Sequence, residues 1–245
     1  MKIVKRLLIL AVTVIMLCVI SVAASAETYG DLTYEINDGV TITDCSSTAT
    51  EVVIPAEIDG YPVTSIGESA FSGCNALTSV TLPDSVTSIG KSAFSDCTAL
   101  ERIYIKSIES WVNISFEELY SNPLQQGVDL YLNGELLTEV IIPDGVISIG
   151  AWAFYGYDDL TSVTLPDSVT SIGESAFSDC DSLASITIGN GVTSIGEYAF
   201  YSCSALERVY IKSIESWVNI SFEELDSNPL QQGADLYLNG ELLTE

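Results

Sequence analysis

Cysteine thiols and paired carboxylates are the side chains in this sequence whose types and spacing could do chemistry. Six cysteines are present, and four of them end the same pattern, A-F-x-x-C: Cys74, Cys97, Cys180 and Cys203. Thiols form disulfides, bind metal ions or pack as small apolar side chains. Histidine is absent, which excludes Ser-His-Asp and Cys-His catalysis and every zinc site that needs a histidine ligand.

The cysteines are predicted to be buried packing residues. Cys74 and Cys97 are 23 residues apart, as are Cys180 and Cys203, and stacked repeats would bring each pair within disulfide range. Tyr157 takes the place of cysteine in another repeat, which favours packing and leaves the two disulfides as the alternative. Thiols spaced along a rod do not converge on one ion, and no C-x-x-C motif occurs, so we expect no metal and no cofactor.

The carboxylate pairs Glu117-Glu118 and Glu223-Glu224 are the remaining candidates for catalysis. A glycosidase needs two carboxylates that face each other across a groove. These pairs are adjacent in sequence, and the serines have no base to activate them. We therefore expect solvated carboxylates and no enzymatic activity.

Internal repeats are the elements that must position all of these residues. The motif S-I-G-x-x-A-F begins at five places: Ser65, Ser88, Ser148, Ser171 and Ser194. A strand-like motif begins at seven others: Glu51, Ser79, Arg102, Glu139, Ser162, Ser185 and Arg208. Most steps along both series are 23 residues. A fixed period of this length is typical of a solenoid.

One repeat unit shows why the repeats should stack. Val80 and Leu82 alternate with polar residues, which predicts a strand with one buried face. Pro83 begins a turn, and Gly90 allows a tight corner. The free-energy cost of ordering the backbone of a lone coil exceeds the stabilisation from burying its few apolar side chains. A coil is therefore stable only when it stacks on neighbouring coils. We expect equivalent phenylalanines to stack: Phe71 on Phe94, and Phe154 on Phe177 on Phe200.

Residues 101–139 and 207–245 form a longer repeat. The two segments differ at only three positions and are offset by 106 residues. Each contains a segment around a tryptophan, Trp111 or Trp217, which predicts a short helical or irregular excursion. Each also contains Asn-Gly between apolar runs, the sequence most typical of a tight β-hairpin.

These motifs resemble the BspA-type leucine-rich repeats of bacterial surface proteins. The unit L-x-x-V-x-L-P-x-x-V-x-x-I-G-x-x-A-F-x-x-C carries the resemblance. The lead-in from Tyr29 resembles the N-terminal cap of that family. The resemblance implies a right-handed solenoid with parallel strands, with a cap and first strand in 27–63 and repeats in 64–245. It implies a role similar to that of adhesins, and it predicts fold more strongly than function.

The N-terminus reads as a secretory signal peptide covering residues 1–26. Lys2, Lys5 and Arg6 precede an apolar run, and Ala24-Ser25-Ala26 is typical of a cleavage site. A membrane anchor is the alternative, although the run is short for a bilayer span. Cleavage would leave five basic and 34 acidic residues, a net charge of −29. We expect a secreted or surface-associated protein that binds no nucleic acid and does not insert into the membrane after cleavage.

Strand alternation predicts which side chains face outward, and we expect this face to bind an extracellular protein or glycan. The predicted row is Val53, Thr81, Tyr104, Ile141, Thr164, Thr187 and Tyr210, with Arg102 and Arg208 beside it. Tyr104 and Ile141 are expected to be neighbours in this row. The alternative function is a structural spacer that displays a C-terminal enzyme or docking module.

The C-terminal end of the sequence predicts a last coil without a cap. Glu245 corresponds to Glu139, the first residue of a strand, and no sequence resembling a polar C-terminal cap follows it. Solenoids need such a cap to shield the last coil. We therefore expect an uncapped last coil, with edge-to-edge self-association through it.

Overall fold

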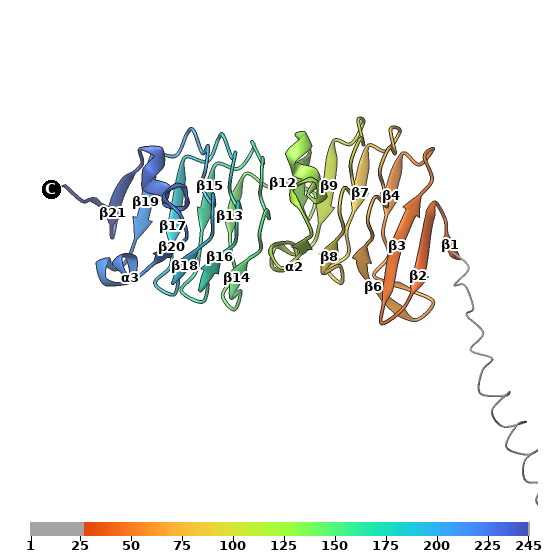
Figure 1. Ribbon diagram of the computed structural model, residues 1–245, viewed down its shortest axis with the longest axis horizontal. Coiled ribbons are helices and arrows are strands. Elements are labelled where there is room, and N and C mark those ends of the chain that lie inside the picture. The colour runs from red at the N-terminus through yellow and green to blue at the C-terminus, as the bar shows by residue number, and fades with distance from the viewer. Residues whose placement is uncertain (1–26, 245) are drawn as a thin grey trace, which may run out of the picture.

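The computed structural model describes residues 27–244, so the predicted signal peptide lies outside the described residues. The described chain is an elongated solenoid in which short strands lie side by side along the long axis (Figure 1). The N-terminal strands are at one end, and the C-terminus is at the other. The sheet pairings between coils are parallel, as the resemblance to BspA-type repeats implied.

Antiparallel strands cover the N-terminal end. β1 (Glu27–Tyr29) pairs with β2 (Leu32–Ile36), and β2 pairs with β3 (Val40–Cys45). β3 then runs parallel to β6 (Tyr61–Ile66), while β5 (Glu57–Ile58) pairs antiparallel with β6. Apolar side chains of β2 and β3 are buried against the first coil, which shields that end of the core.

The seven strands predicted from the repeat, together with β11 and β21, form a first ladder in two parts. The part in the N-terminal half contains β4 (Glu51–Val53), β7 (Ser79–Thr81), β9 (Arg102–Ile105) and β11 (Asp129–Leu132). The part in the C-terminal half contains β13 (Glu139–Ile141), β15 (Ser162–Thr164), β17 (Ser185–Ile188), β19 (Arg208–Ile211) and β21 (Asp235–Leu238). In both parts, equivalent residues of successive repeats pair directly, because each step of the repeat is one turn of the solenoid.

A second ladder of very short strands lies in the S-I-G motifs and in the Ser-Phe segments of the two long repeats. Its members are β6, β8 (Ser88–Ile89) and β10 (Ser115–Phe116), then β14 (Ser148–Ile149), β16 (Ser171–Ile172), β18 (Ser194–Ile195) and β20 (Ser221–Phe222). Apart from β6, each of these strands is two residues long, too short to produce an alternating pattern. The sequence predicted only that the isoleucines point inward, which they do.

The long repeats contain the predicted excursions and hairpins. α2 (Ile108–Val112) and α3 (Ile214–Val218) carry the tryptophans. The 3₁₀ turns η1 (Leu119–Ser121), η2 (Pro123–Gln126), η3 (Leu225–Ser227) and η4 (Pro229–Gln232) follow them. β12 (Glu135–Leu136) and β22 (Glu241–Leu242) fold back antiparallel onto β11 and β21. Asn133 and Gly134 have φ angles of 54° and 88°, as a type I′ turn requires.

The hairpin of residues 129–136 corrects one sequence prediction. Tyr104 and Ile141 are not neighbours, because β11 pairs with β9 and places Tyr131 beside Tyr104. β12 occupies the other edge of β11, so the first ladder is interrupted before β13. The expected row of seven strands missed β11 and β21.

Side-chain hydrogen bonds join the two halves where the first ladder is interrupted. The Trp111 indole N–H donates to the carbonyl oxygen of Ala153 at 2.9 Å. The Tyr157 hydroxyl donates to the carbonyl oxygen of Leu130 at 3.3 Å. Both side chains are buried, so the junction is continuous with the core on either side.

The core is a set of aligned apolar side chains from successive coils. The predicted phenylalanine stacks are present, with ring centroids 5.0 Å apart for Phe71 and Phe94. Phe177 lies 5.5 Å from both Phe154 and Phe200, with nearly parallel rings. These rings are fully buried, and the core runs unbroken through both halves.

Candidate binding surfaces

The outward row of the first ladder is exposed as strand alternation requires. Val53 and Ile141 have exposed fractions of 70% and 71%, while their neighbours Val52 and Val140 are buried. The other predicted members are half-buried or exposed: Thr81, Tyr104, Thr164, Thr187 and Tyr210. The structure thus places the row at the surface, while its role in binding stays a prediction.

Two tyrosine pairs are the main features of this row. The rings of Tyr104 and Tyr131 are 5.1 Å apart between centroids, and those of Tyr210 and Tyr237 are also 5.1 Å apart. The sequence reasoning missed Tyr131 and Tyr237. The alternation in D-L-Y-L is the signal that could have revealed them, because it places the tyrosine on the same outward face as Tyr104 and Tyr210.

The predicted arginines lie beside the tyrosine pairs. Arg102 forms an ion pair with Glu101 at 3.4 Å, and Arg208 forms one with Glu207 at 3.6 Å. Both guanidinium groups remain partly exposed, so each pair contributes little to stability. Each tyrosine pair therefore has an arginine near it, on a chain in which acidic residues far outnumber basic ones.

Asp129 is a titratable group whose environment differs from that of a simple surface carboxylate. Burial raises its pKa, and the hydrogen bond and negative charge of Asp159, from the next coil, raise it further. A hydrogen bond from Tyr131 and the positive charge of Arg102 lower the pKa of Asp129, but these effects are smaller. Because the folded protein binds this proton more tightly than the unfolded chain, folding is favoured as the pH falls toward the ordinary value of 3.8.

Replacing Asp159 by asparagine is expected to remove the electrostatic repulsion between the carboxylates of Asp159 and Asp129. At pH 7 we expect Asp159→Asn to raise the free energy of unfolding by about 0.5 kcal/mol, the scale of a partly exposed charge pair. The gain should shrink on acidification and vanish below pH 3.8, because Asp129 then becomes protonated in both states. Urea unfolding at several pH values measures it, and Asp158→Asn, the same change at an exposed neighbour, is the control. An equal gain in both variants at all pH values would contradict the assignment.

The cysteines are buried free thiols within the described residues. The thiols of Cys97, Cys180 and Cys203 each lie 3.0 Å from a carbonyl oxygen of the preceding coil. Burial raises the pKa of Cys97 to about 11 and that of Cys203 to about 12. These thiols pack the core, as the sequence predicted, and they are poor nucleophiles at neutral pH.

One carboxylate of each Glu-Glu pair accepts a hydrogen bond from a neighbouring coil. Glu118 accepts a hydrogen bond from the hydroxyl of Ser92 at 3.0 Å. Glu223 accepts one from the backbone N–H of Glu197 at 3.3 Å. Over residues 27–244, no group of three or more acidic, cysteine or histidine side chains is arranged to hold a metal ion. The same residues contain no helix with the length and apolarity to cross a bilayer.

Comparisons with known proteins identify the repeats. Residues 44–129 and 127–231 match the family described as BspA type Leucine rich repeat region, in six copies. A leucine-rich repeat protein of T. pallidum is 29% identical over 76% of this chain and 81% of its own, with a TM-score of 0.49. A leucine-rich cell surface protein of Faecalibacterium prausnitzii is 32% identical over 78% of this chain, with a TM-score of 0.52. The chain spans 55% of that second protein, and no curated protein matches significantly.

Proposed function

The chain belongs to the BspA-type leucine-rich repeat family, and from this membership we propose that it is a secreted or cell-surface protein that binds an extracellular protein or glycan. The proposed role is non-enzymatic. Its solenoid presents side chains from many coils along one extended face, the geometry that repeat proteins use for binding.

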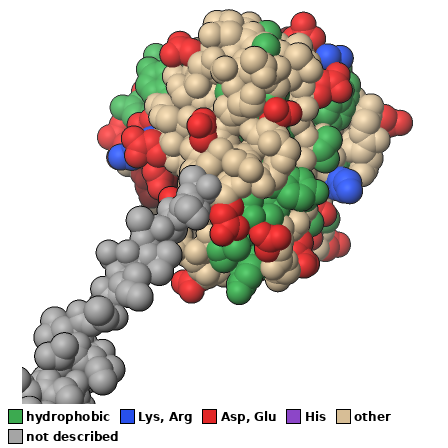
Figure 2. Space-filling model, turned by 90° about the vertical axis from the view of Figure 1, so that its right-hand side faces the viewer, with side chains coloured by type: hydrophobic (Ala, Val, Ile, Leu, Met, Phe, Trp, Pro, Cys, Tyr) green, Lys and Arg blue, Asp and Glu red, His purple; other side chains and the backbone are tan. Residues whose placement is uncertain are grey.

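The proposed location rests on the N-terminus and on the family. Residues 1–26 have the composition of a secretory signal. The F. prausnitzii protein that resembles this chain is itself a cell surface protein. The chain is strongly acidic, and at the N-terminal end scattered acidic side chains outnumber basic ones (Figure 2), which is compatible with an exposed and soluble repeat domain.

The observation that carries the binding proposal is the pair of tyrosine clusters on the first ladder. Tyrosine supplies large contact area and a polar hydroxyl, and it is enriched at the energetic centres of interfaces. Tyr104 and Tyr131 repeat at Tyr210 and Tyr237, five strands further along the two parts of the first ladder. Such spacing presents two similar patches to a long or repetitive ligand, which favours avidity.

The non-enzymatic part of the proposal is supported by the state of the candidate groups. The thiols are buried and protonated at neutral pH. The carboxylate pairs hydrogen-bond to neighbouring coils. Without histidine, the serines have no imidazole base.

A binding array followed by substitution tests this function. The protein is screened on immobilised extracellular-matrix proteins and glycans, and the best ligand is titrated. Tyr104→Ala combined with Tyr210→Ala is expected to weaken binding about ten-fold or more, because aromatic anchors dominate interface energies. Calorimetry or surface plasmon resonance measures the loss.

The control keeps the rings and removes only the hydroxyls. Tyr104→Phe with Tyr210→Phe should retain most of the affinity if ring contact dominates. Thr187→Ala, in a strand of the same ladder that lacks tyrosine, should have little effect. Unchanged binding by the double alanine variant to every ligand found on the array would sink the proposal for this face.

A spacer role is the competing function. The F. prausnitzii protein extends well beyond the part that this chain matches, so in that protein the repeats accompany further sequence. A spacer would bind nothing on the array by itself. It would be recognised by a catalytic or docking module encoded in frame with the repeats.

A further inference from the structure

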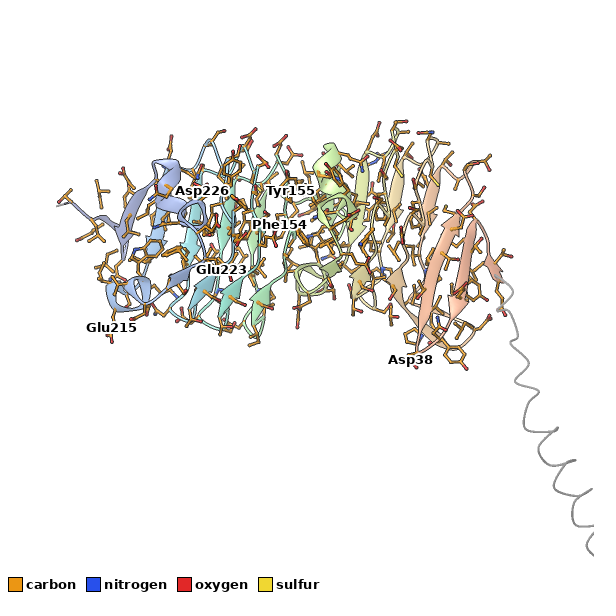
Figure 3. The ribbon with its side chains drawn as sticks, viewed as in Figure 1. Asp38, Phe154, Tyr155, Glu215, Glu223 and Asp226 are labelled. Atoms are coloured by element: carbon orange, nitrogen blue, oxygen red, sulfur yellow. The ribbon has the colours of Figure 1, made fainter. Side chains whose placement is uncertain are left out.

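A hollow of about 480 Å³ opens on the surface of the C-terminal half, away from the tyrosine pairs of the first ladder. Four aromatic side chains line it: Trp152, Tyr155, Tyr198 and Tyr201. They come from two coils that are separated by a third, and Tyr155 is marked in Figure 3. We call this feature the aromatic hollow.

The coil between the aromatic walls forms the floor. Hydrogen bonds of 2.8–2.9 Å tie its backbone to both neighbouring coils, including Trp152 N–H to Glu174 and Ser175 N–H to Glu197. Ser175 and Ser178 have exposed fractions of only 8% and 2%, because the larger side chains on either side rise above them. Small residues between two aromatic walls therefore create the hollow.

The aromatic residues are departures from the repeat. Other coils carry serine at the same two positions: Ser69, Ser72, Ser92, Ser95, Ser175 and Ser178. The coil thus folds well without aromatic side chains here. Tyr198 and Tyr201 nevertheless remain 39% and 48% exposed, so burial does not explain their presence.

Two of the aromatic residues also adopt an unfavourable backbone conformation. Trp152 and Tyr198 have φ angles of 58° and 56°. Left-handed φ is uncommon for bulky side chains and costs about 1–2 kcal/mol. Ser69, Ser92 and Ser175 have the same left-handed φ at the equivalent position, so this conformation belongs to the repeat. Bulky and exposed residues at positions where serine suffices nevertheless point to a role in binding.

Negative charge surrounds the aromatic hollow. Glu174 and Asp179 line the hollow. Within the part of the chain that the structure describes, no lysine or arginine lines it. Burial and the neighbouring Asp179 carboxylate raise the pKa of Tyr155 to about 12. The carboxylate of Glu224 is the main cause of a raised pKa at Tyr198. Both walls therefore lie in a negative potential.

The spacing of the walls fits a cation. Two steps along the solenoid separate them, about 10 Å at the usual spacing of strands. A charged group midway would lie about 5 Å from aromatic side chains on both sides, within the range of a cation–π interaction. The carboxylates of Glu174 and Asp179 would pair with the same group.

We propose that the aromatic hollow binds an arginine or lysine side chain of a basic polypeptide segment. Cation–π contacts with the aromatic walls and charge pairing with Glu174 and Asp179 would hold it. The inference rests on the proposed binding role of the protein, but it does not require the tyrosine pairs of the first ladder.

Titration with hexa-arginine tests the proposal. The peptide carries a fluorescent label, and anisotropy reports binding in 150 mM NaCl. Tyr198→Ser with Tyr201→Ser is expected to weaken binding about ten-fold, since two aromatic partners are removed. The substitutions leave the charge unchanged and place serine where other coils already have it, so the fold should be retained. Thermal unfolding verifies this.

The matched control removes two exposed tyrosines elsewhere. Tyr29→Ser with Tyr61→Ser, at the N-terminal end, should leave the affinity within about two-fold. Asp179→Asn should weaken binding about five-fold and reduce its dependence on salt. Equal affinities for the hollow variant and the control variant would mean diffuse attraction to the acidic surface, and the proposal would fail.

The indole of Trp152 distinguishes a polypeptide from a glycan. The other tryptophans, Trp111 and Trp217, are buried, so nitrogen-15 NMR should show the Trp152 indole N–H shifting most on addition of hexa-arginine. Cellohexaose and chitohexaose are the comparison probes. A shift with either sugar and none with hexa-arginine would overturn the proposal in favour of a glycan site. Tyr104→Ala with Tyr210→Ala should leave hexa-arginine binding intact, so each site can fail independently.

Discussion

Replacing Phe177 by alanine is expected to lower the free energy of unfolding by about 3–5 kcal/mol. The ring is fully buried and stacks 5.5 Å from both Phe154 and Phe200. Its removal leaves a cavity between two coils whose backbones are held in register by the ladders on either side. The cavity therefore cannot collapse without breaking hydrogen bonds. Urea unfolding followed by circular dichroism measures the loss.

Two further variants show whether stacking causes the effect. Phe177→Leu keeps most of the volume and should cost about 1–2 kcal/mol. Phe94→Ala removes a ring with one aromatic neighbour, Phe71, and should cost less than Phe177→Ala. A loss below about 1 kcal/mol for Phe177→Ala would mean that the coils are stabilised mainly by their backbone ladders, contrary to the view that a shared core holds them together.

The repeat made the coil predictable from the sequence. In the unit of residues 78–100, strand alternation correctly assigned Val80 to the core and Thr81 to the surface. Where coils follow each other at the period of 23 residues, equivalent side chains lie next to their copies, including the phenylalanines of each half. Contacts in a solenoid are between neighbouring repeats, so sequence spacing translates directly into spatial neighbours.

The interruption of the first ladder could not be predicted from the same spacing. β11 carries Asp129-Leu130-Tyr131-Leu132 in place of the usual motif, and its position inside a long repeat concealed it. The Asn-Gly turn did predict the hairpin. The order of strands depends on tertiary pairing that the sequence pattern does not specify: β11 pairs with β9, and β12 pairs with the other edge of β11. That pairing placed Tyr131 beside Tyr104 and separated both from Ile141.

The candidate sites were harder to predict than the fold. The aromatic hollow depends on three consecutive coils with large, small and large side chains at the same positions, as in Trp152, Ser175 and Tyr198. The repeat pattern predicts the residues that recur in every coil, and it gives no information about the residues that depart from it. In a solenoid, the consensus residues build the core, whereas departures on exposed faces are free to specify a ligand.

Replacing Gly90 by alanine is the second substitution for which we expect a large loss of stability. The sequence predicted a tight corner at Gly90, and the structure supplies the reason. A Cβ atom there would lie 2.6 Å from the backbone nitrogen of Glu68 and 2.8 Å from the carbonyl carbon of Gly67, in the preceding coil. These are backbone atoms, so no side-chain rotation relieves the overlap. We expect Gly90→Ala to cost about 3 kcal/mol, the upper range for overpacking, as measured by urea unfolding.

Gly73→Ala separates this close approach from the ordinary conformational role of glycine. Gly73 has a φ of 72°, and a Cβ atom there would meet nothing within 4 Å. Its substitution should therefore cost only the left-handed strain, about 1 kcal/mol. A smaller loss for Gly90→Ala than for Gly73→Ala would mean that the coils slide apart at little cost. The backbone hydrogen bond of 2.8 Å from Gly90 to Ile66 argues against such sliding, because separating the coils would break it. Close contact between successive turns, maintained by a residue without a side chain, would then limit how far this solenoid tolerates substitution.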